Sequence, residues 1–372
     1  MAFKADGPHL PLQRLGRNMH RCAFVQRILF RQENIDPHKM CMKKTPKVSV
    51  IVPVYGVEKY IGRCVRSLFE QTLEDIEYIF VDDCTPDGSI SVLNSELSSY
   101  PARQEQVKII RHEKNEGLVH ARQTGLKAAS GEYIAHCDSD DWVDTNLYGT
   151  LYDQAAAQGS DMVAFVCKYT DGERTIKEAL TGNRTETAEC LADMIHGKMW
   201  WSLCNKLIRS DVYRHSDIIY PTDGMGEDMC LSLQLLYHCK SISYNHDVCY
   251  HYYQNPTSMT KVQTEESCLS RFRQICRNVE IVKTFYSGKP VNDSLRKGFR
   301  YLEFNAKRPL TPLLSERKYR KLWRQTYQGC EWSVLTDPEA PAHDRLKSLL
   351  CLLGITPLQY ERLRGLVKRN QE

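Results

Sequence analysis

Three kinds of sequence signal are missing from this 372-residue chain. No apolar run approaches the roughly 20 residues that cross a bilayer, and the best run, Leu349–Ile355, is far too short for a membrane channel. No G-x-G-x-x-G follows the first predicted strand, and G-x-x-x-x-G-K-S/T is absent. These absences argue against a dinucleotide enzyme and a P-loop phosphotransferase. The 42% hydrophobic and 26% charged residues indicate a globular protein.

Over most of the chain neither basic nor acidic residues are in large excess. The formal net charge is +4, but residues 1–47 hold ten Lys/Arg and three Asp/Glu, so they carry +7 and the remainder −3. A mildly acidic body does not indicate a nucleic-acid binder. The first 46 residues lack the apolar core of a secretory signal. We expect a basic flexible tail over residues 1–46, of which 1–41 are either an over-extended gene start or an appendage.

The fifteen cysteines include no C-x-x-C pair and their number is odd. Without a secretory signal, they favour reduced core thiols in a cytoplasmic protein. His246, Cys249 and His251 have loosely zinc-like spacing, but structural zinc sites pair their ligands more regularly. We therefore expect structural histidines there rather than a metal centre.

From residue 47 the hydrophobic pattern alternates between strands and helices. Short β-branched or apolar runs predict strands, and apolar residues at i, i+3, i+4 and i+7 predict helices between them. This alternation predicts right-handed βαβ crossovers and a mostly parallel sheet. After about residue 185 the pattern favours helices, and beyond residue 265 it is helical throughout. The predicted strands are Val48–Val52, Ile76–Val81, Val107–Ile110, Gly131–Cys137 and Met162–Val166, with helices at residues 61–69 and 118–129.

Carboxylates follow the predicted strands at their carboxyl ends, where ligands bind in sheets of this kind. Asp82-Asp83 and Asp138-Ser139-Asp140-Asp141 would bring five of them to one rim. Neighbouring carboxylates cannot all ionise cheaply without a cation. Mg²⁺ or Mn²⁺ prefers such oxygen ligands and commonly bridges to substrate phosphates. The sequence therefore predicts a divalent metal site at the rim.

A transfer reaction at this rim also needs a base that activates an incoming hydroxyl. Glu227-Asp228, which follow Gly226, are the candidates. Trp200 and Trp201 could stack on an acceptor sugar, but we expect core positions for both, because large aromatics bury much area.

Several motifs together resemble one family in order and spacing, over residues 47–260. The chain is similar to the family 2 glycosyltransferases of the GT-A fold, especially bacterial enzymes that build capsule, O-antigen or exopolysaccharide. The motifs are Val48-Ser49-Val50-Ile51-Val52-Pro53-Val54-Tyr55, Phe80-Val81-Asp82-Asp83, Asn115-Glu116-Gly117-Leu118 with Ala121-Arg122, and Asp138-Ser139-Asp140-Asp141-Trp142.

The resemblance implies a role for each matching position. The nucleotide-sugar, most commonly a UDP-sugar in this family, would lie against the strand ends, and the reaction would invert the anomeric carbon in a single displacement. Arg122 would counter the acidic rim or the donor, or form a structural salt bridge. The remaining implied roles are Pro53, Val54 and Tyr55 for the nucleobase pocket, Glu58 near the nucleotide, Asp83 for the uracil edge, Asp138 for ribose or metal, Asp140 as main metal ligand, and Asp228 beside Glu227 as catalytic base.

Two departures from the family pattern concern loop geometry. Gly56 replaces the usual asparagine, and Cys84 replaces a common glycine. The Gln-x-x-Arg-Trp motif of processive synthases is absent, which favours a distributive enzyme that adds one sugar to a glycan or lipid-linked acceptor. We expect a donor half at residues 47–145, an acceptor half at 146–260 and a helical C-terminal region at 261–372.

Two other functions are compatible with the sequence. A non-catalytic nucleotide-sugar-binding or scaffold protein would share the fold, and a sugar nucleotidyltransferase would share the sheet and the metal carboxylates. The latter would carry a glycine-rich basic loop after the first strand, where this chain has Tyr55-Gly56-Val57-Glu58. The basic C-terminal helices, which include Leu358–Val367, would either dock peripherally on an anionic inner membrane surface or present a solvated face.

Overall fold

A computed structural model of the protein describes residues 45–179, 182–255 and 264–355. The predicted basic tail, apart from its last two residues, and the pattern Leu358–Val367 lie outside the described residues. Within those residues, nine strands form one mixed sheet in the order β3-β2-β1-β4-β8-β6-β9-β5, with β7 paired to β6. The strands are β1 Val48–Val54, β2 Ile76–Asp82, β3 Val107–Arg111, β4 Tyr133–His136, β5 Trp142–Val143, β6 Met162–Thr170, β7 Thr175–Glu178, β8 Lys206–Arg209 and β9 Ile242–Tyr253.

The half of the sheet that contains β3, β2, β1 and β4 is parallel, which confirms the predicted βαβ pattern. Val54 at the end of β1 stands opposite Asp82 at the end of β2. The carboxyl ends of these strands therefore meet at one edge, as a parallel arrangement requires.

The other half of the sheet differs from the prediction. The short strand β8 lies antiparallel between β4 and β6, and β9 runs parallel to β6. Both strands fall after residue 185, where the sequence favoured helices. A half-buried strand is recognised in a sequence by alternating polar and apolar residues. β8 lacks this signal, because Lys206 at its beginning has a fully buried side chain.

Eleven α-helices and three short 3-10 helices surround the sheet within the described residues. The predicted stripe of α1 is confirmed, because Ile61, Cys64, Val65, Leu68 and Phe69 are all buried. The helices are α1 Ile61–Phe69, α2 Ser89–Ser98, α3 Leu118–Ala128, α4 Leu147–Gln158, α5 Thr187–Ile195, α6 Glu227–His238, α7 Glu265–Tyr286, α8 Asp293–Ala306, α9 Arg317–Gln325, α10 Cys330–Leu335 and α11 Ala342–Leu352, with η2 Pro101–Gln106, η3 Val212–Arg214 and η5 Arg308–Leu313.

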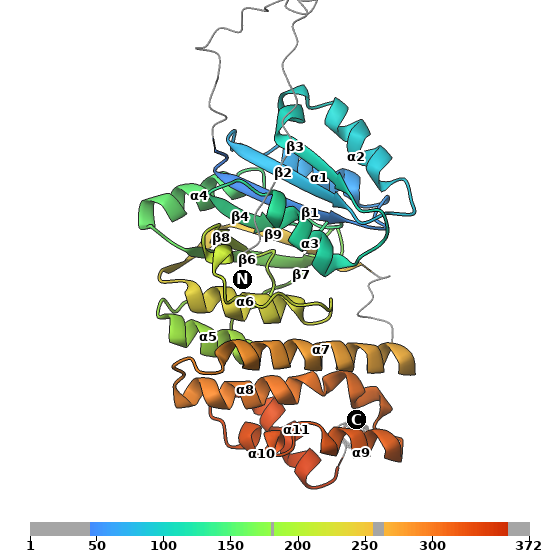
Figure 1. Ribbon diagram of the computed structural model, residues 1–372, viewed down its shortest axis with the longest axis vertical. Coiled ribbons are helices and arrows are strands. Elements are labelled where there is room, and N and C mark those ends of the chain that lie inside the picture. The colour runs from blue at the N-terminus through green and yellow to red at the C-terminus, as the bar shows by residue number, and fades with distance from the viewer. Residues whose placement is uncertain (1–44, 180–181, 256–263, 356–372) are drawn as a thin grey trace, which may run out of the picture. The chain divides into compact units, whose positions relative to one another are not determined.

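The C-terminal helices share a core with one face of the sheet. Buried side chains of β4 and β6, such as Ile134 and Met162, belong to the same apolar cluster as Leu302 and Phe304 of α8. In Figure 1 α6 lies between the sheet and α7, and α8 follows beyond α7. This stacking places α7 and η5 beside the beginning of α6, where the candidate base is found.

The cysteines that the structure describes are thirteen, all free and ten of them buried, in agreement with the predicted core thiols. No helix in the described part of the chain is long and apolar enough to cross a membrane.

Candidate active site

The ends of β1, β2 and β4 bring the predicted donor-binding residues to one edge of the sheet. Pro53 and Val54 end β1, and Tyr55 follows them with an exposed side chain. The backbone N–H of Asp83 donates to the carbonyl of Val54 at 3.0 Å, so the first two strand ends are joined directly. Asp138 follows β4, which lies on the other side of β1.

Asp83 holds the loop that leads into α3. Its Oδ1 accepts from the backbone N–H of Glu116 at 2.8 Å, and its Oδ2 accepts from that of Gly117 at 2.8 Å. The His112 Nδ1 also lies 2.8 Å from Oδ1. Gly117 has a φ of +89°, a conformation that suits glycine. The buried Asp83 carboxylate is thus engaged by its own chain and positions the start of α3.

Glu58 ties the loop after β1 to the beginning of α2. Its Oε2 accepts from the backbone N–H of Gly88 at 3.0 Å, while its own N–H donates to Asp87 Oδ2 at 3.0 Å. These two hydrogen bonds fix the loop after β1, which the sequence predicts to lie near the nucleotide. This loop is not a glycine-rich phosphate-binding loop.

Arg122 of α3 joins three carboxylates that are far apart in the sequence. Its Nη2 donates to Asp138 Oδ1 at 2.7 Å, its Nη1 donates to Asp228 Oδ1 at 2.7 Å, and Nη1 also donates to Glu227 Oε1. The guanidinium is buried among these three carboxyl groups, and its charge favours their ionised forms. The structure shows salt bridges from Arg122 to these acids, Asp138 of the predicted rim among them. A contact of Arg122 with the donor stays a prediction.

Glu227 and Asp228 differ in access, although both belong to the first turn of α6. The Asp228 side chain is 32% exposed and that of Glu227 is 4% exposed. Burial raises the pKa of Glu227 to about 8, against the opposing effect of Arg122. Burial also raises the pKa of Asp228, again opposed by Arg122. Gly226, with φ of +80°, starts the helix and turns Asp228 toward the cavity described next.

A cavity of about 1110 Å³ adjoins Asp228. One part of its wall comes from the sheet side and includes Arg122, Asp138, Trp200, Trp201 and Tyr252. The other part comes from the C-terminal helices, which lie outside the segment that sequence motifs covered. The sequence does not predict these residues, because nothing in the polar helical pattern indicates which helix face lines a cavity. They include Ser270, Arg271 and Gln274 of α7, Asn305 of α8, and Arg308 and Pro312 of η5.

Trp200 and Trp201 are only half-buried, so the prediction that both are core residues is wrong. Each packs against the apolar core on one side and lines the cavity on the other. The indole N–H of Trp201 donates to the carbonyl of Met194, which orients the ring. The aromatic faces at the cavity are available for stacking.

Lys206 supports this tryptophan segment from inside. Its Nζ donates to the carbonyl of Trp200 at 2.7 Å, to that of Ser202 at 2.6 Å and to Oδ1 of Asn205 at 2.9 Å. The side chain is fully buried, and burial lowers its pKa to about 8. The sequence gives no signal for this role, because an isolated lysine usually indicates solvent exposure.

Fewer than five carboxylates are available at the predicted rim, because buried ones form hydrogen bonds within the protein. Asp82 is buried and accepts from the backbone N–H of Thr85 at 2.8 Å. Asp141 is buried as well, and it accepts from the Tyr250 hydroxyl at 2.6 Å and from the Tyr253 N–H at 2.7 Å. Asp82 thus holds the turn after β2, and Asp141 joins its loop to β9. Hydrogen bonds inside the protein satisfy these two groups.

Asp138 and Asp140 supply carboxylate oxygens of the kind that a hard divalent cation takes as ligands. Asp140 Oδ2 lies 3.4 Å from Asn255 Nδ2, and Arg63 Nη2 donates to the Asp140 carbonyl at 3.3 Å. Burial, followed by the nearby charge of Asp138, raises the pKa of Asp140. The donor set consists of oxygen atoms, which Mg²⁺ and Mn²⁺ prefer.

The zinc-like pattern is only partly brought together. Cys249 Sγ lies 3.3 Å from His251 Nε2, which pairs with Asp144 Oδ1 at 2.8 Å. His251 also stacks on Trp142 with ring centroids 5.1 Å apart. His246 is exposed and does not belong to this group. His251 is therefore partnered, and the ligand atoms of Asp144, Cys249 and His251 all lie within 4.8 Å of one another, close enough to share a metal ion.

The geometry defines an α/β protein with a carboxylate edge and a helix-borne acid beside a large cavity. Residues 49–221 match the family described as Glycosyl transferase family 2. Over this segment, the chain belongs to that family.

Two curated relatives have informative names. The chain is 32% identical over 224 residues to an uncharacterized glycosyltransferase, EpsJ, of Bacillus subtilis (strain 168), which covers 58% of this chain and 64% of EpsJ. It is 30% identical over 211 residues to a poly(ribitol-phosphate) beta-glucosyltransferase of Bacillus spizizenii, covering 55% of this chain and 32% of that protein. The chain thus spans less than two thirds of the length of either relative.

Solved structures share the fold. Staphylococcus aureus TarS 1-349, in complex with UDP-GlcNAc, matches with a TM-score of 0.53 and 19% identity, over 78% of this chain and 86% of that one. A mannosyltransferase from Pyrobaculum calidifontis, in complex with GDP-Man and Mn²⁺, matches with a TM-score of 0.50 and 15% identity, over 82% and 87%. At these identities the likeness establishes the architecture, an α/β sheet of GT-A type with helices on its faces.

Proposed function

We propose that the protein is an inverting, metal-dependent glycosyltransferase that moves one sugar from a nucleotide-sugar to a hydroxyl of a glycan or lipid-linked acceptor. The observation that carries the proposal is the position of Asp228. Its partly exposed carboxylate faces a large cavity while Arg122 connects it to Asp138 of the metal motif. One residue thus links the base to the donor edge.

The donor would bind at the ends of β1 and β2, over residues 47–145. Pro53, Val54 and Tyr55 would contact the nucleobase, with Glu58 and Asp83 holding the two loops around it. A UDP-sugar is the proposed donor, since a fold neighbour is known in complex with UDP-GlcNAc. Asp138 and Asp140 would hold Mn²⁺ or Mg²⁺, which supplies charge neutralisation of the departing diphosphate.

The base would act on the acceptor hydroxyl. Asp228 would accept its proton as the hydroxyl oxygen bonds to the anomeric carbon, while the bond from that carbon to the diphosphate oxygen breaks on the opposite face. A carboxylate with a raised pKa is a stronger base than an ordinary aspartate. The buried Glu227 would support this arrangement by sharing Arg122.

The acceptor would enter the cavity that residues 146–260 and the C-terminal helices enclose. The half-buried faces of Trp200 and Trp201 provide stacking surfaces for a sugar ring. The relatives named above support a place in surface polysaccharide synthesis, and the reduced cysteines support a cytoplasmic enzyme.

The decisive test separates binding from turnover. With UDP-sugar, Mn²⁺ and saccharide acceptors, Asp228→Asn is expected to slow transfer by about 100-fold to 10,000-fold, while calorimetry shows unchanged UDP binding. Asp211→Asn, at an exposed position, is the matched control and should transfer sugar like the wild type. Equal turnover by Asp228→Asn and wild type would contradict the proposal.

The two alternative functions predict different results. A scaffold protein would bind the nucleotide-sugar and show no transfer with any acceptor in the wild type. A nucleotidyltransferase would release pyrophosphate from a nucleoside triphosphate and a sugar phosphate. Thermal-shift measurements with UDP-, GDP- and dTDP-sugars, with and without Mn²⁺, identify the donor before these assays are made.

A further inference from the structure

Helix α11 has its polar and apolar faces reversed relative to an ordinary surface helix. Asp344 and Ser348 of this helix are fully buried, whereas Leu346, Leu349 and Leu352 are 38–47% exposed. Leu353, the residue after the helix, is 66% exposed. The spacing places Leu346, Leu349 and Leu353 opposite Asp344 and Ser348, with Leu352 at the edge of the same exposed stripe. A surface helix normally presents the opposite arrangement.

Strong polar contacts fix this orientation. Asp344 Oδ2 accepts from the Tyr301 hydroxyl of α8 at 2.6 Å and from Arg308 Nη2 of η5 at 2.6 Å. Rotation of α11 to bury its leucines would withdraw Asp344 from both partners and leave a cation without its carboxylate. The leucine stripe, Leu346, Leu349, Leu352 and Leu353, is therefore held at the surface by the fold.

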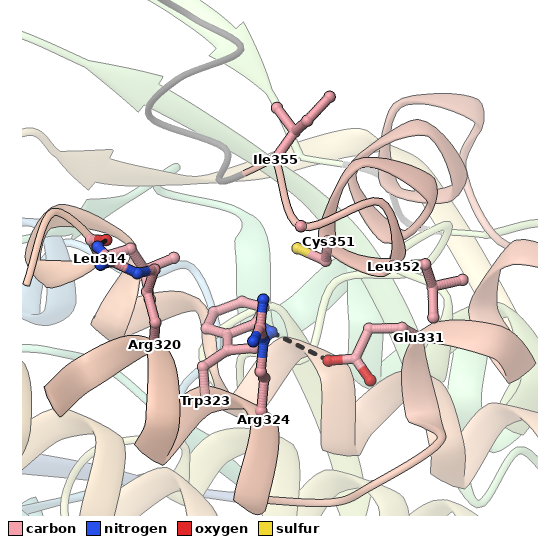
Figure 2. A pocket seen from close by; sticks show the side chains of 9 residues that line it. Leu314, Arg320, Trp323, Arg324, Glu331, Cys351, Leu352 and Ile355 are labelled. Carbon is pink, nitrogen blue, oxygen red and sulfur yellow. Dashed lines mark hydrogen bonds between the residues drawn. The ribbon is translucent and has the colours of Figure 1, made fainter. Parts of the chain in front are cut away.

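A pocket of about 240 Å³, whose lining includes Arg320, Arg324 and Glu331, adjoins the leucine stripe at Leu352. Figure 2 shows Arg320, Trp323 and Arg324 of α9 on one side of it, with Cys351, Leu352 and Ile355 on the other. Arg320 donates to the carbonyl of Leu314 at 2.9 Å. The Arg324 side chain is exposed and makes no hydrogen bond or ion pair with any residue that the structure describes.

The charge of the segment that carries the stripe favours an anionic partner. Residues 314–355 contain seven Lys/Arg and five Asp/Glu, and three of these acids, Glu331, Asp337 and Asp344, are buried and paired. The charge left at the surface is therefore mainly positive. A second copy of the chain would bring these cations against one another, whereas an anionic lipid surface would neutralise them and receive the leucines.

We propose that the leucine stripe inserts into an anionic lipid surface while Arg324 binds lipid phosphate beside it. Arg308, which holds Asp344, also lines the cavity next to Asp228. The proposal concerns a surface distinct from the candidate active site and is tested without turnover.

The experiment measures partition of the full chain onto vesicles by co-sedimentation. Vesicles of phosphatidylglycerol with phosphatidylcholine are expected to bind the wild type, and vesicles of phosphatidylcholine alone to bind it much less. The double variant Leu349→Ser/Leu353→Ser should lower partition by more than about tenfold. Arg324→Gln should lower it about fivefold, the factor expected for one surface cation.

A matched control distinguishes this surface from exposed apolar residues in general. Ile176 of β7 is 58% exposed and lies in another part of the fold, so Ile176→Ser should bind vesicles like the wild type. The basic segments outside the described residues are unchanged in every variant. If the leucine and arginine variants bind as well as the wild type, those segments account for binding and the proposal is overturned.

Two other occupants of the leucine stripe give different results. If residues 356–372 cover it, the double leucine variant will melt several degrees lower and vesicle binding will be unchanged. If a second copy covers it, sedimentation velocity without lipid will show a wild-type dimer that the double variant abolishes. Either result overturns lipid docking. A monomeric wild type, with variants of unchanged melting temperature and reduced vesicle binding, supports it.

Discussion

Arg122 donates a 2.7 Å hydrogen bond to Asp228 across a separation of 106 residues in the chain. The same guanidinium reaches Asp138, so the helix after β3 connects the acid of the metal motif to the acid of α6. The proposed donor and acceptor sites thus share one buried cation. Loss of Arg122 itself is therefore expected to affect both sites.

Replacing Arg122 should damage both stability and transfer. Arg122→Met leaves three neighbouring carboxylates without their cation, and breaking such a buried network typically costs about 3–5 kcal/mol. Urea unfolding should show that loss, and transfer by the folded fraction should fall by at least about 100-fold. Lys127→Met, at an exposed position on the same helix, is the control. An Arg122→Met variant of wild-type stability would show that the ion pairs are unimportant.

Replacement by asparagine should change the metal requirement at Asp140 and the stability of the fold at Asp141. Asp140→Asn is expected to raise the Mn²⁺ concentration needed for half-maximal transfer at least tenfold with little loss of stability. Asp141→Asn should cost about 1–3 kcal/mol in urea unfolding, because the buried carboxylate accepts from Tyr250 and Tyr253. Chelation of the metal should stop transfer by the wild type. Equal metal dependence of both variants would contradict the assignment of Asp140.

Asp83 is expected to affect the fold as well as the donor. In Asp83→Asn an amide NH₂ replaces one oxygen and faces a donor, either the Gly117 N–H or the Glu116 N–H. Urea unfolding should show a loss of about 1–3 kcal/mol. Glu116→Gln keeps the backbone N–H and alters only a side chain that is 40% exposed, so it should unfold like the wild type. Full stability of Asp83→Asn would mean that the loop is held by other contacts.

Lys206 should make stability depend on pH in an alkaline window. Burial lowers its folded-state pKa from 10.5 to about 8. Between these values the unfolded chain binds a proton that the folded chain lacks, so the free energy of unfolding rises with pH by about 1.4 kcal/mol per pH unit from this group. Below pH 8 both states hold the proton and this dependence vanishes.

Urea unfolding of the wild type and Lys206→Met at pH 8 and pH 10 measures this effect. Between pH 8 and pH 10 the free energy of unfolding of the wild type should rise by about 2 kcal/mol relative to that of Lys206→Met. Lys297→Met, at an exposed position of α8, controls for removal of one lysine. Parallel pH profiles for the wild type and Lys206→Met would show that burial does not depress the proton affinity of Lys206.

Local patterns predicted the parts of the fold that local physics determines. The predicted ends of the first two strands, Val52 and Val81, lie within two residues of the observed ends at Val54 and Asp82. They follow from local periodicity, as does the buried stripe of α1. The partners of Arg122 do not, because no periodic pattern joins residues more than a hundred positions apart. Lys206 was overlooked because burial of a charge depends on three acceptors that only the folded loop supplies.

Helix α11 shows the same limit in another form. Its leucine pattern predicts an amphipathic helix, and the helix is present. Periodicity specifies which residues share a face, but it does not determine which face turns inward. Asp344 decides that question through Tyr301 and Arg308, two residues that are remote in the sequence.

The two walls of the large cavity are encoded in separate stretches of sequence. Arg122 and Asp138 belong to the first, and Gln274 and Arg308 belong to the second. Substitutions that accumulate in α7 and η5 can therefore reshape the receiving wall while the carboxylates of the other wall are inherited unchanged. Under the proposed function, lineages could acquire new acceptors by drift and selection in the C-terminal helices and still keep the ancestral sugar donor.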